Sequence, residues 1–256
     1  MMKHIGNGLL LAIQFFSVFP VKKELPLQEN NVTSMYALLP LLGAFIGSAV
    51  AASVWLLRDF TDASSLLMAF IMVAMGFALT GGLHLDGMAD VGDAYFSYQD
   101  REKRLLIMGD PRIGAFGAMV LLFVVIGKII VAAEIVQSVP LVIVAAIPIL
   151  SRTGLLILFS TTASAKENGL AAFFQQKANS KIIKISAGVT LFIVSALAVS
   201  AFGWWLAGAV MAVLLLSVII YRRWCIRNFG GATGDLFGAY VEGAEVLLWT
   251  VLLFFI

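Results

Sequence analysis

Three aspartates follow a very apolar stretch in the segment GGLHLDGMADVGDAYFS, at 81–97. Asp86, Asp90 and Asp93 have the spacing i, i+4, i+7, which on a helix places them along one face. Like charges on one face repel each other, and a divalent cation that prefers oxygen ligands, such as Mg²⁺, Mn²⁺ or Ca²⁺, neutralises them. The Gly and Ala residues between the acids allow another helix or a large polar ligand to approach closely. We therefore interpret the segment as a metal and ligand site rather than as a solvated acidic loop.

Other side chains beside this cluster suit the same chemistry. His84 is a candidate general base or phosphate contact, and the alternative is an interfacial histidine bonded to a backbone carbonyl. In MGDPRIGAFG, at 108–117, Asp110 precedes Pro111, which favours an extended or turn conformation. Arg112 follows directly. A carboxylate and a guanidinium side by side at a membrane surface suit a metal-bound phosphate, which arginine binds with two parallel hydrogen bonds.

A second polar patch lies in RNFGGATGDLFGAYVEGAE, at 227–245. We expect Thr233 to cap a helix whose first N–H groups form an anion site. Asp235 and Glu242 share a face of that helix, and carboxylates inside a membrane span are functional by default. Arg152 lies at mid-span in another apolar segment and is expected to pair with a carboxylate of the site. The candidate phosphate-binding residues of this patch also include Arg222, Arg223 and Arg227.

The composition indicates a membrane protein. An ordinary soluble domain has about 25% charged residues, whereas this chain has 12%, and 61% of its residues are hydrophobic. We predict an all-α, polytopic bundle with one domain over 1–256. The segment 5–19 is too short for a comfortable span and is interpreted as an interfacial or re-entrant helix. The seven expected spans lie at about 35–57, 65–83, 114–136, 139–159, 182–201, 203–221 and 238–256.

The basic residues occupy alternate loops. Twelve of the 17 lysines and arginines fall in 20–34, 84–113, 160–181 and 222–237, whereas 58–64, 137–138 and the turn near Gly203 contain Arg58 alone. The positive-inside rule places the first set of loops in the cytoplasm. Both acidic patches then face the cytoplasm, where a metal and arginines together suit a diphosphate. The chain has no Walker A pattern, so we expect a pre-activated diphosphate donor rather than a nucleotide-driven pump.

Six stretches make the whole chain resemble the cobalamin (5′-phosphate) synthase family, also called adenosylcobinamide-GDP ribazoletransferase. They are IQFFSVFPV (13–21), PLLGAFIG (40–47), TGGLHLDGMADVGDAYF (80–96), RLLIMGDPRIGAFG (104–117), LSRTG (150–154) and GGATGDLFGAYVEGAE (230–245). The resemblance implies a Mg²⁺-dependent, multi-pass transferase of a bacterial or archaeal cell membrane. Its substrates would be adenosylcobinamide-GDP and α-ribazole, or α-ribazole 5′-phosphate, with GMP released. No nucleic-acid partner is expected, and an oligomer is compatible with the sequence.

On this reading Asp86, Asp90 and Asp93 hold Mg²⁺ on the diphosphate, and Asp110 and Asp235 complete the metal shell. Arg112 and some of the arginines at 222–227 bind phosphate oxygens. His84 or one of the aspartates accepts the proton of the attacking ribose hydroxyl. The family usually has a basic residue and a serine where this chain has Gly109 and Pro111, which changes the shape of one loop.

Two other functions are compatible with parts of the pattern. A CDP-alcohol phosphotransferase also uses an aspartate-rich helix with Mg²⁺, but its second D-x-x-x-D does not occur here at the usual spacing. A transporter would use the charges inside the spans, such as Lys128, Arg152 and Glu242, to line a path. Its polar residues would extend through the depth of several spans, whereas here they crowd one side.

Overall fold

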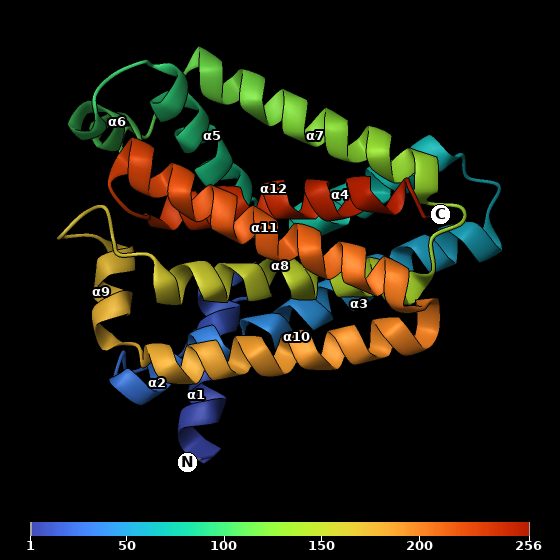
Figure 1. Ribbon diagram of the computed structural model, residues 1–256, viewed down its shortest axis with the longest axis horizontal. Coiled ribbons are helices and arrows are strands. Elements are labelled where there is room, and N and C mark those ends of the chain that lie inside the picture. The colour runs from blue at the N-terminus through green and yellow to red at the C-terminus, as the bar shows by residue number, and fades with distance from the viewer. Residues whose placement is uncertain (1, 256) are drawn as a thin grey trace.

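The computed structural model describes residues 2–255, and most of these residues are helical. Figure 1 shows the long helices side by side along the longest axis of the molecule, with shorter helices crossing one end. The elements are α1 (Met2–Phe16), α2 (Glu29–Ala37), α3 (Leu39–Phe60), α4 (Ser65–Thr80), α5 (Leu83–Phe96), α6 (Arg101–Ile107), α7 (Ala115–Ile135), α8 (Leu141–Thr161), α9 (Leu170–Lys177), α10 (Ser180–Phe202), α11 (Trp204–Phe229) and α12 (Gly234–Leu252).

The predicted all-α membrane bundle is confirmed, but fewer of its helices qualify as spans than expected. Within residues 2–255, five helices are long and apolar enough to cross a membrane: α2 continued by α3, α7, α8, α10 and α11. The segment predicted at 65–83 is instead α4 and α5, which would make a sixth span only as a broken pair. The span predicted at 238–256 is α12, whose three carboxylates set it apart from the apolar helices.

The break between α4 and α5 arises at two glycines. Gly81 and Gly82 have φ values of 66° and 73°, in the left-handed region that favours glycine. The axes of α4 and α5 consequently differ by 93°. The helix α5 therefore does not continue the direction of α4 but slants across one end of the molecule, where it packs against α7 and α12 (Figure 1).

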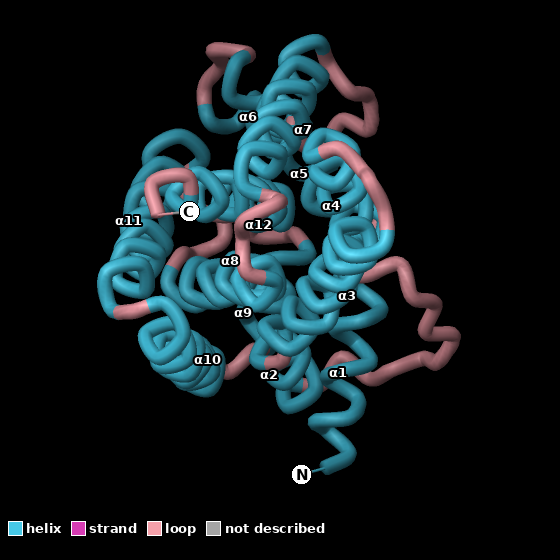
Figure 2. The backbone as a smooth tube through the Cα atoms, turned by 90° about the vertical axis from the view of Figure 1, so that its right-hand side faces the viewer, coloured by secondary structure: helices cyan, strands magenta, loops and turns pink. Residues whose placement is uncertain are grey.

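The centre of the bundle is α12. It packs against α5, α7, α8 and α11, and most of its side chains are buried. Figure 2, a view along the long helices, shows α12 surrounded by its neighbours. A helix in this position can carry charged side chains, because protein rather than lipid surrounds them.

Close contact between α3 and α8 anchors the other half of the bundle. The motif PLLGAFIG presents Gly43 and Gly47 to α8, and a Cβ atom at Gly43 would lie 2.5 Å from the carbonyl oxygen of Pro148. At Gly47 the carbonyl oxygen of Ala145 occupies the same space. Small residues four positions apart let two helix backbones meet, which is a common mode of packing in membranes.

The loops that the charge pattern assigned to one side do meet at one end of the molecule. Arg101 donates hydrogen bonds to the carbonyl of Arg227, Ala165 donates to the carbonyl of Ala232, and Lys177 donates to the carbonyl of Leu27. These contacts join all four basic loops. At the opposite end, Arg58 donates to the carbonyls of Val136 and Val139, so two of the remaining loops, 58–64 and 137–138, also meet.

The N-terminal segment forms a single helix, α1. Its 15 residues span about 22 Å at 1.5 Å per residue, less than the roughly 30 Å of a bilayer core. Both ribbon views show α1 running across the direction of the long helices (Figures 1 and 2). This arrangement agrees with the interfacial helix expected at 5–19.

Candidate active site

The two polar patches of the sequence meet where α5 lies against the start of α12. A Cβ atom at Gly87 would lie 2.7 Å from the carbonyl oxygen of Asp235, and one at Gly238 would lie 3.2 Å from the Cα atom of His84. The two helices therefore run antiparallel in backbone contact over one helical turn. A Cβ at Gly82 or Gly234 would meet nothing within 4 Å. Of the glycines in these two patches, Gly87 and Gly238 allow the approach.

Three carboxylates, those of Asp86, Asp90 and Asp235, lie near this contact, close enough for their charges to act on one another. Burial, together with the negative charges of Asp86, Asp235 and Asp93, raises the pKa of Asp90 to about 7. Burial also raises the pKa of Asp235 above its usual value. No ion pair neutralises Asp86, Asp90 or Asp235 within the described residues. The arrangement has an excess of negative charge that a bound cation would relieve.

The third aspartate of the α5 motif is engaged differently. Asp93 accepts hydrogen bonds from the backbone N–H groups of Gly114, at 2.6 Å, and Gly117, at 2.8 Å. These groups belong to the unsatisfied first turn of α7. A Cβ atom at either glycine would collide with the Asp93 carboxylate. Asp93 thus attaches α5 to α7, although the sequence predicts a metal ligand.

A cavity of about 370 Å³ opens beside the acids. Its polar wall contains His84 and Asp86 from α5, Thr233 and Asp235 from the start of α12, and Lys166. Its apolar lining includes aromatic side chains from α1, α2 and α9, together with Leu155 of α8 and Phe237 of α12. The volume falls at the lower end of the roughly 300–1,000 Å³ typical of small-molecule sites. The cavity places acids, one cation and an apolar surface within reach of one ligand.

Lys166 is a site residue that the sequence does not single out. The charge of its ammonium group acts on both Asp90 and Asp235, yet it forms no ion pair in the described structure. Its loop is fixed to the GGATG turn, because Ala165 donates to the carbonyl of Ala232 and Ala232 donates to that of Ala163, both at 2.9 Å. Ser164 accepts the backbone N–H of Lys166. In the sequence Lys166 is only one of many basic loop residues, and the pairing of two distant loops carries no local signal.

Thr233 acts as the predicted helix cap. Its side chain accepts the backbone N–H of Leu236 at 3.2 Å and lies 3.2 Å from the carboxylate of Asp235. The nearby arginines do not line the cavity. Arg222 donates to the carbonyl of Thr161, and the side chains of Arg223 and Arg227 are exposed. The described structure thus brings Thr233 to the acids but leaves these three arginines at the rim.

Asp110 and Arg112 bind each other at the surface. Two guanidinium nitrogens of Arg112 donate to Asp110, at 2.9 and 2.7 Å, and these hydrogen bonds lower the pKa of Asp110 to about 2. Neither residue lines the cavity. The predicted side-by-side arrangement is present, but the pair stands apart from the acids of α5 and α12.

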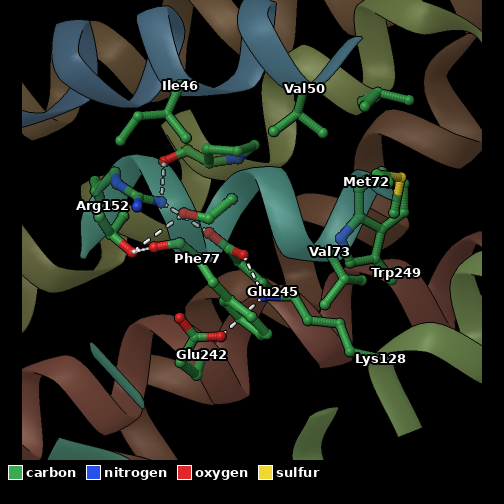
Figure 3. Close-up of a pocket in the computed structure, with 14 residues that line it drawn as sticks. Ile46, Val50, Met72, Val73, Phe77, Lys128, Arg152, Glu242, Glu245 and Trp249 are labelled. Carbon is green, nitrogen blue, oxygen red and sulfur yellow. Dashed lines mark hydrogen bonds and ion pairs between the residues drawn. The ribbon is translucent and has the colours of Figure 1, made fainter. Parts of the chain in front are cut away.

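The charges inside the bundle form a separate, fully paired network (Figure 3). The ammonium group of Lys128 lies 2.9 Å from Glu242 and 2.6 Å from Glu245, and Arg152 lies 2.7 Å from Glu245. All four side chains are nearly inaccessible to solvent. Arg152 has the carboxylate partner expected of a mid-span cation. Arg152 and Glu242, candidates for substrate binding, are both occupied by partners from the protein.

His84 connects this network with the cavity. Its imidazole is 3% exposed, and its Nδ1 atom lies 4.0 Å from Glu242 without a hydrogen bond. Because the same residue lines the cavity, His84 stands between the paired interior charges and the unpaired acids.

The described residues do not form a complete metal site by themselves. Among residues 2–255, no three Asp, Glu, His or Cys side chains converge closely enough to hold a metal ion. Mg²⁺ commonly binds through one or two carboxylates together with substrate phosphates and water. Asp86, Asp90 and Asp235 fit a cation of that kind, because their oxygens are its preferred ligands and their charges are not otherwise neutralised.

Comparison with known proteins gives a consistent match over the whole chain. Residues 8–253 match the family model of cobalamin-5-phosphate synthase. An adenosylcobinamide-GDP ribazoletransferase of Geobacillus kaustophilus is 34% identical over 253 residues, which cover 98% of this chain and 97% of that protein. The enzyme of the same name from Geobacillus thermodenitrificans is 35% identical, over 98% of this chain and 96% of that protein. The one from Clostridium tetani is 32% identical, over 99% of this chain and 97% of that protein. No solved structure matches the chain. The chain belongs to the cobalamin-5-phosphate synthase family.

Proposed function

We propose that this protein is an adenosylcobinamide-GDP ribazoletransferase, acting in the last steps of cobalamin synthesis. It would join adenosylcobinamide-GDP to α-ribazole, or to its 5′-phosphate, and release GMP. The relatives named above support the reaction. The observation that carries the proposal is the cavity in which Asp86, Asp235 and Lys166 meet an apolar wall, because a diphosphate donor and a nucleoside acceptor need both surfaces.

In the proposed reaction, a ribose hydroxyl of α-ribazole attacks the phosphorus atom attached to the corrinoid arm. A new phosphorus–oxygen bond forms, and the bond to the GMP phosphate breaks. The proton of the hydroxyl passes to His84 or Asp86, which are acceptors in the cavity wall. Lys166 contacts the diphosphate oxygens and offsets the charge that develops on the leaving phosphate.

We propose Mg²⁺ as the cofactor, held by Asp86, Asp90 and Asp235. The bound ion would neutralise the diphosphate and stabilise the leaving GMP. The support is the charge of the site: the three carboxylates are unpaired, and burial together with mutual repulsion raises the pKa of Asp90. Asp93 and Thr233 position the helices that carry these acids.

A direct assay tests the function. Purified protein in detergent is incubated with adenosylcobinamide-GDP, α-ribazole and Mg²⁺, and GMP is measured. We expect GMP to appear only when all three are present, and EDTA to stop its release. Release of CMP from a CDP-alcohol, with no GMP from the corrinoid substrate, would instead identify a CDP-alcohol phosphotransferase.

We also propose that the active face is cytoplasmic and that the membrane is the cell membrane. The four basic loops, which the structure joins at the end that carries the acids, support this orientation. The test uses single cysteines introduced at two exposed positions, Gln99 and Asp62, which lie at opposite ends of the bundle. In a Cys225→Ser background, an impermeant thiol reagent should label only Asp62→Cys in intact cells, and labelling of Gln99→Cys from outside would reverse the orientation.

A further inference from the structure

The apolar lining of the cavity beside the acids contains a group of aromatic side chains that contact one another, called the aromatic wall below. Phe15 and Phe16 come from α1, Tyr36 from α2 and Phe174 from α9. The ring centroids of Phe15 and Phe174 are 5.3 Å apart, those of Tyr36 and Phe174 are 5.9 Å apart, and those of Phe16 and Tyr36 are 6.0 Å apart. The consecutive helices α1 and α2 and the helix α9, which is distant from them in sequence, thus contribute to one aromatic surface. Such a surface binds flat aromatic ligands by edge and face contacts.

Tyr36 adds a specific polar group to this surface. The residue is 5% exposed, yet its hydroxyl has no hydrogen-bond partner among the described residues. The hydroxyl oxygen itself is not fully buried, and a tyrosine hydroxyl that is largely removed from water usually finds a hydrogen-bond partner. The hydroxyl is therefore available to a polar atom of a ligand in the cavity that Tyr36 lines.

We infer that this aromatic wall binds the base of the acceptor, α-ribazole, and that Tyr36 donates a hydrogen bond to its free ring nitrogen. This inference rests on the proposed function. The base is a flat benzimidazole with one ring nitrogen attached to ribose and the other carrying a lone pair. With the base against Phe16, Tyr36 and Phe174, the ribose extends toward the polar part of the same cavity, which Asp86 and Asp235 line.

The chemistry of the cavity favours the acceptor over the donor. The donor's corrinoid ring carries many amide groups, which need hydrogen-bond partners that an aromatic wall does not offer. A lipid chain would leave the polar wall of His84, Asp86, Lys166 and Asp235 without a partner. The benzimidazole nucleoside has an apolar half and a polar half, as the cavity does.

Tyr36→Phe tests the hydrogen bond with little change in packing. We expect the KM for α-ribazole to rise about three- to tenfold, as for the loss of one neutral hydrogen bond, while the KM for adenosylcobinamide-GDP stays the same. The affinity for α-ribazole alone, measured by calorimetry without donor, should fall by the same factor. Tyr98→Phe, at an exposed position, is the matched control and should change neither constant.

Phe16→Leu tests the aromatic contact at a partly exposed residue whose replacement leaves the core intact. We expect weaker binding of α-ribazole alone, with Phe123→Leu at an exposed position as its control. Free benzimidazole should compete with α-ribazole but not with the donor. Competition with the donor instead, or an unchanged affinity for α-ribazole in both Tyr36→Phe and Phe16→Leu, would overturn the inference. Wild-type protein that binds α-ribazole through these residues but releases no GMP would overturn only the proposed function.

Discussion

The helix α12 carries acids in two regions that differ in how their charge is balanced. At its first turn, Asp235 lies near Asp86 and Asp90 beside a cavity, and within residues 2–255 no cation forms an ion pair with them. Two turns further on, Glu242 and Glu245 are held by Lys128 and Arg152 at distances of 2.6–2.9 Å. Buried charges are stable only when they are paired. The interior group is complete without a ligand, whereas the group at the cavity depends on charges that a ligand brings.

The largest effect should come from breaking the complete group. Glu245→Gln removes the carboxylate shared by Lys128 and Arg152 and leaves buried positive charge without its partner. We expect a loss of about 3–5 kcal/mol in the free energy of unfolding, measured by denaturant-induced unfolding in detergent. Glu134→Gln, at an exposed position, serves as the control. If Glu245→Gln unfolds like the wild type, the interior charges do not stabilise the bundle.

At the cavity we expect activity to be lost and stability to be kept. Asp90→Asn removes a metal ligand and a repulsive charge together, so turnover should fall at least about 100-fold while stability is kept or improved. The control is Asp62→Asn in an exposed loop. Near-normal turnover of Asp90→Asn at limiting Mg²⁺ would show that the acids of α5 do not hold the metal.

The double variant Asp90→Asn with Asp235→Asn tests whether α5 and α12 form one site. If Asp90 and Asp235 act on the same metal–diphosphate unit, the double variant should be little worse than either single variant, because residues that act as a unit are not additive. Each single variant should also need more Mg²⁺ to reach its own maximum rate. If the losses of turnover multiply, and Asp235→Asn needs no more Mg²⁺ than the wild type, Asp235 acts separately from Asp90.

Lys166 is the cation that the cavity itself supplies, and its removal should have a smaller effect. Lys166→Met should lower kcat/KM for adenosylcobinamide-GDP about tenfold or somewhat more, as for a hydrogen bond to a charged group. Lys166→Arg should recover part of the loss. Lys181→Met, at the same end of the molecule and exposed, should have no effect. An equal loss in Lys181→Met would indicate only a general attraction of anions to this face.

The sequence predicts the elements that local chemistry determines. The spacing of Asp86, Asp90 and Asp93 indicates a helix, Thr233 indicates a helix start, and the charge pattern correctly groups the loops that meet. Which residues pack against each turn of these helices depends on the tertiary structure and is not encoded locally. Nothing near Asp93 in sequence reveals that the amides of Gly114 and Gly117 bind its carboxylate, and nothing near Lys166 reveals its contact with the turn at 230–234. The sequence predicts seven spans, and by length and composition five helices qualify, or six with the broken pair of α4 and α5. The helix α12 is apolar enough to suggest a span from the sequence, but its three carboxylates set it apart from the helices that qualify.

The smallest effect concerns the contact that brings the two acidic helices together. Gly87→Ala and Gly243→Ala make the same change, at α5 and at α12. Alanine favours a helix by roughly 1 kcal/mol over glycine, so both changes are favourable for the isolated helix. At Gly243 a Cβ meets nothing within 4 Å, whereas at Gly87 it would lie 2.7–2.9 Å from backbone atoms of Asp235. The backbone of α12 cannot yield as a side chain would, so Gly87→Ala must separate Asp90 from Asp235.

We expect Gly87→Ala to lower turnover up to about tenfold, since displacements of a fraction of an ångström in a catalytic site have effects of this size. The concentration of Mg²⁺ needed for half-maximal rate should also rise. Gly243→Ala should keep wild-type turnover and unfold at the same or a slightly higher temperature. Because the two variants differ only in the contact between α5 and α12, equal turnover and equal Mg²⁺ demand in both would mean that the acids work without the close approach of these helices. The cavity acids would then form a site on α5 alone, and the contrast between the two ends of α12 would lose its functional meaning.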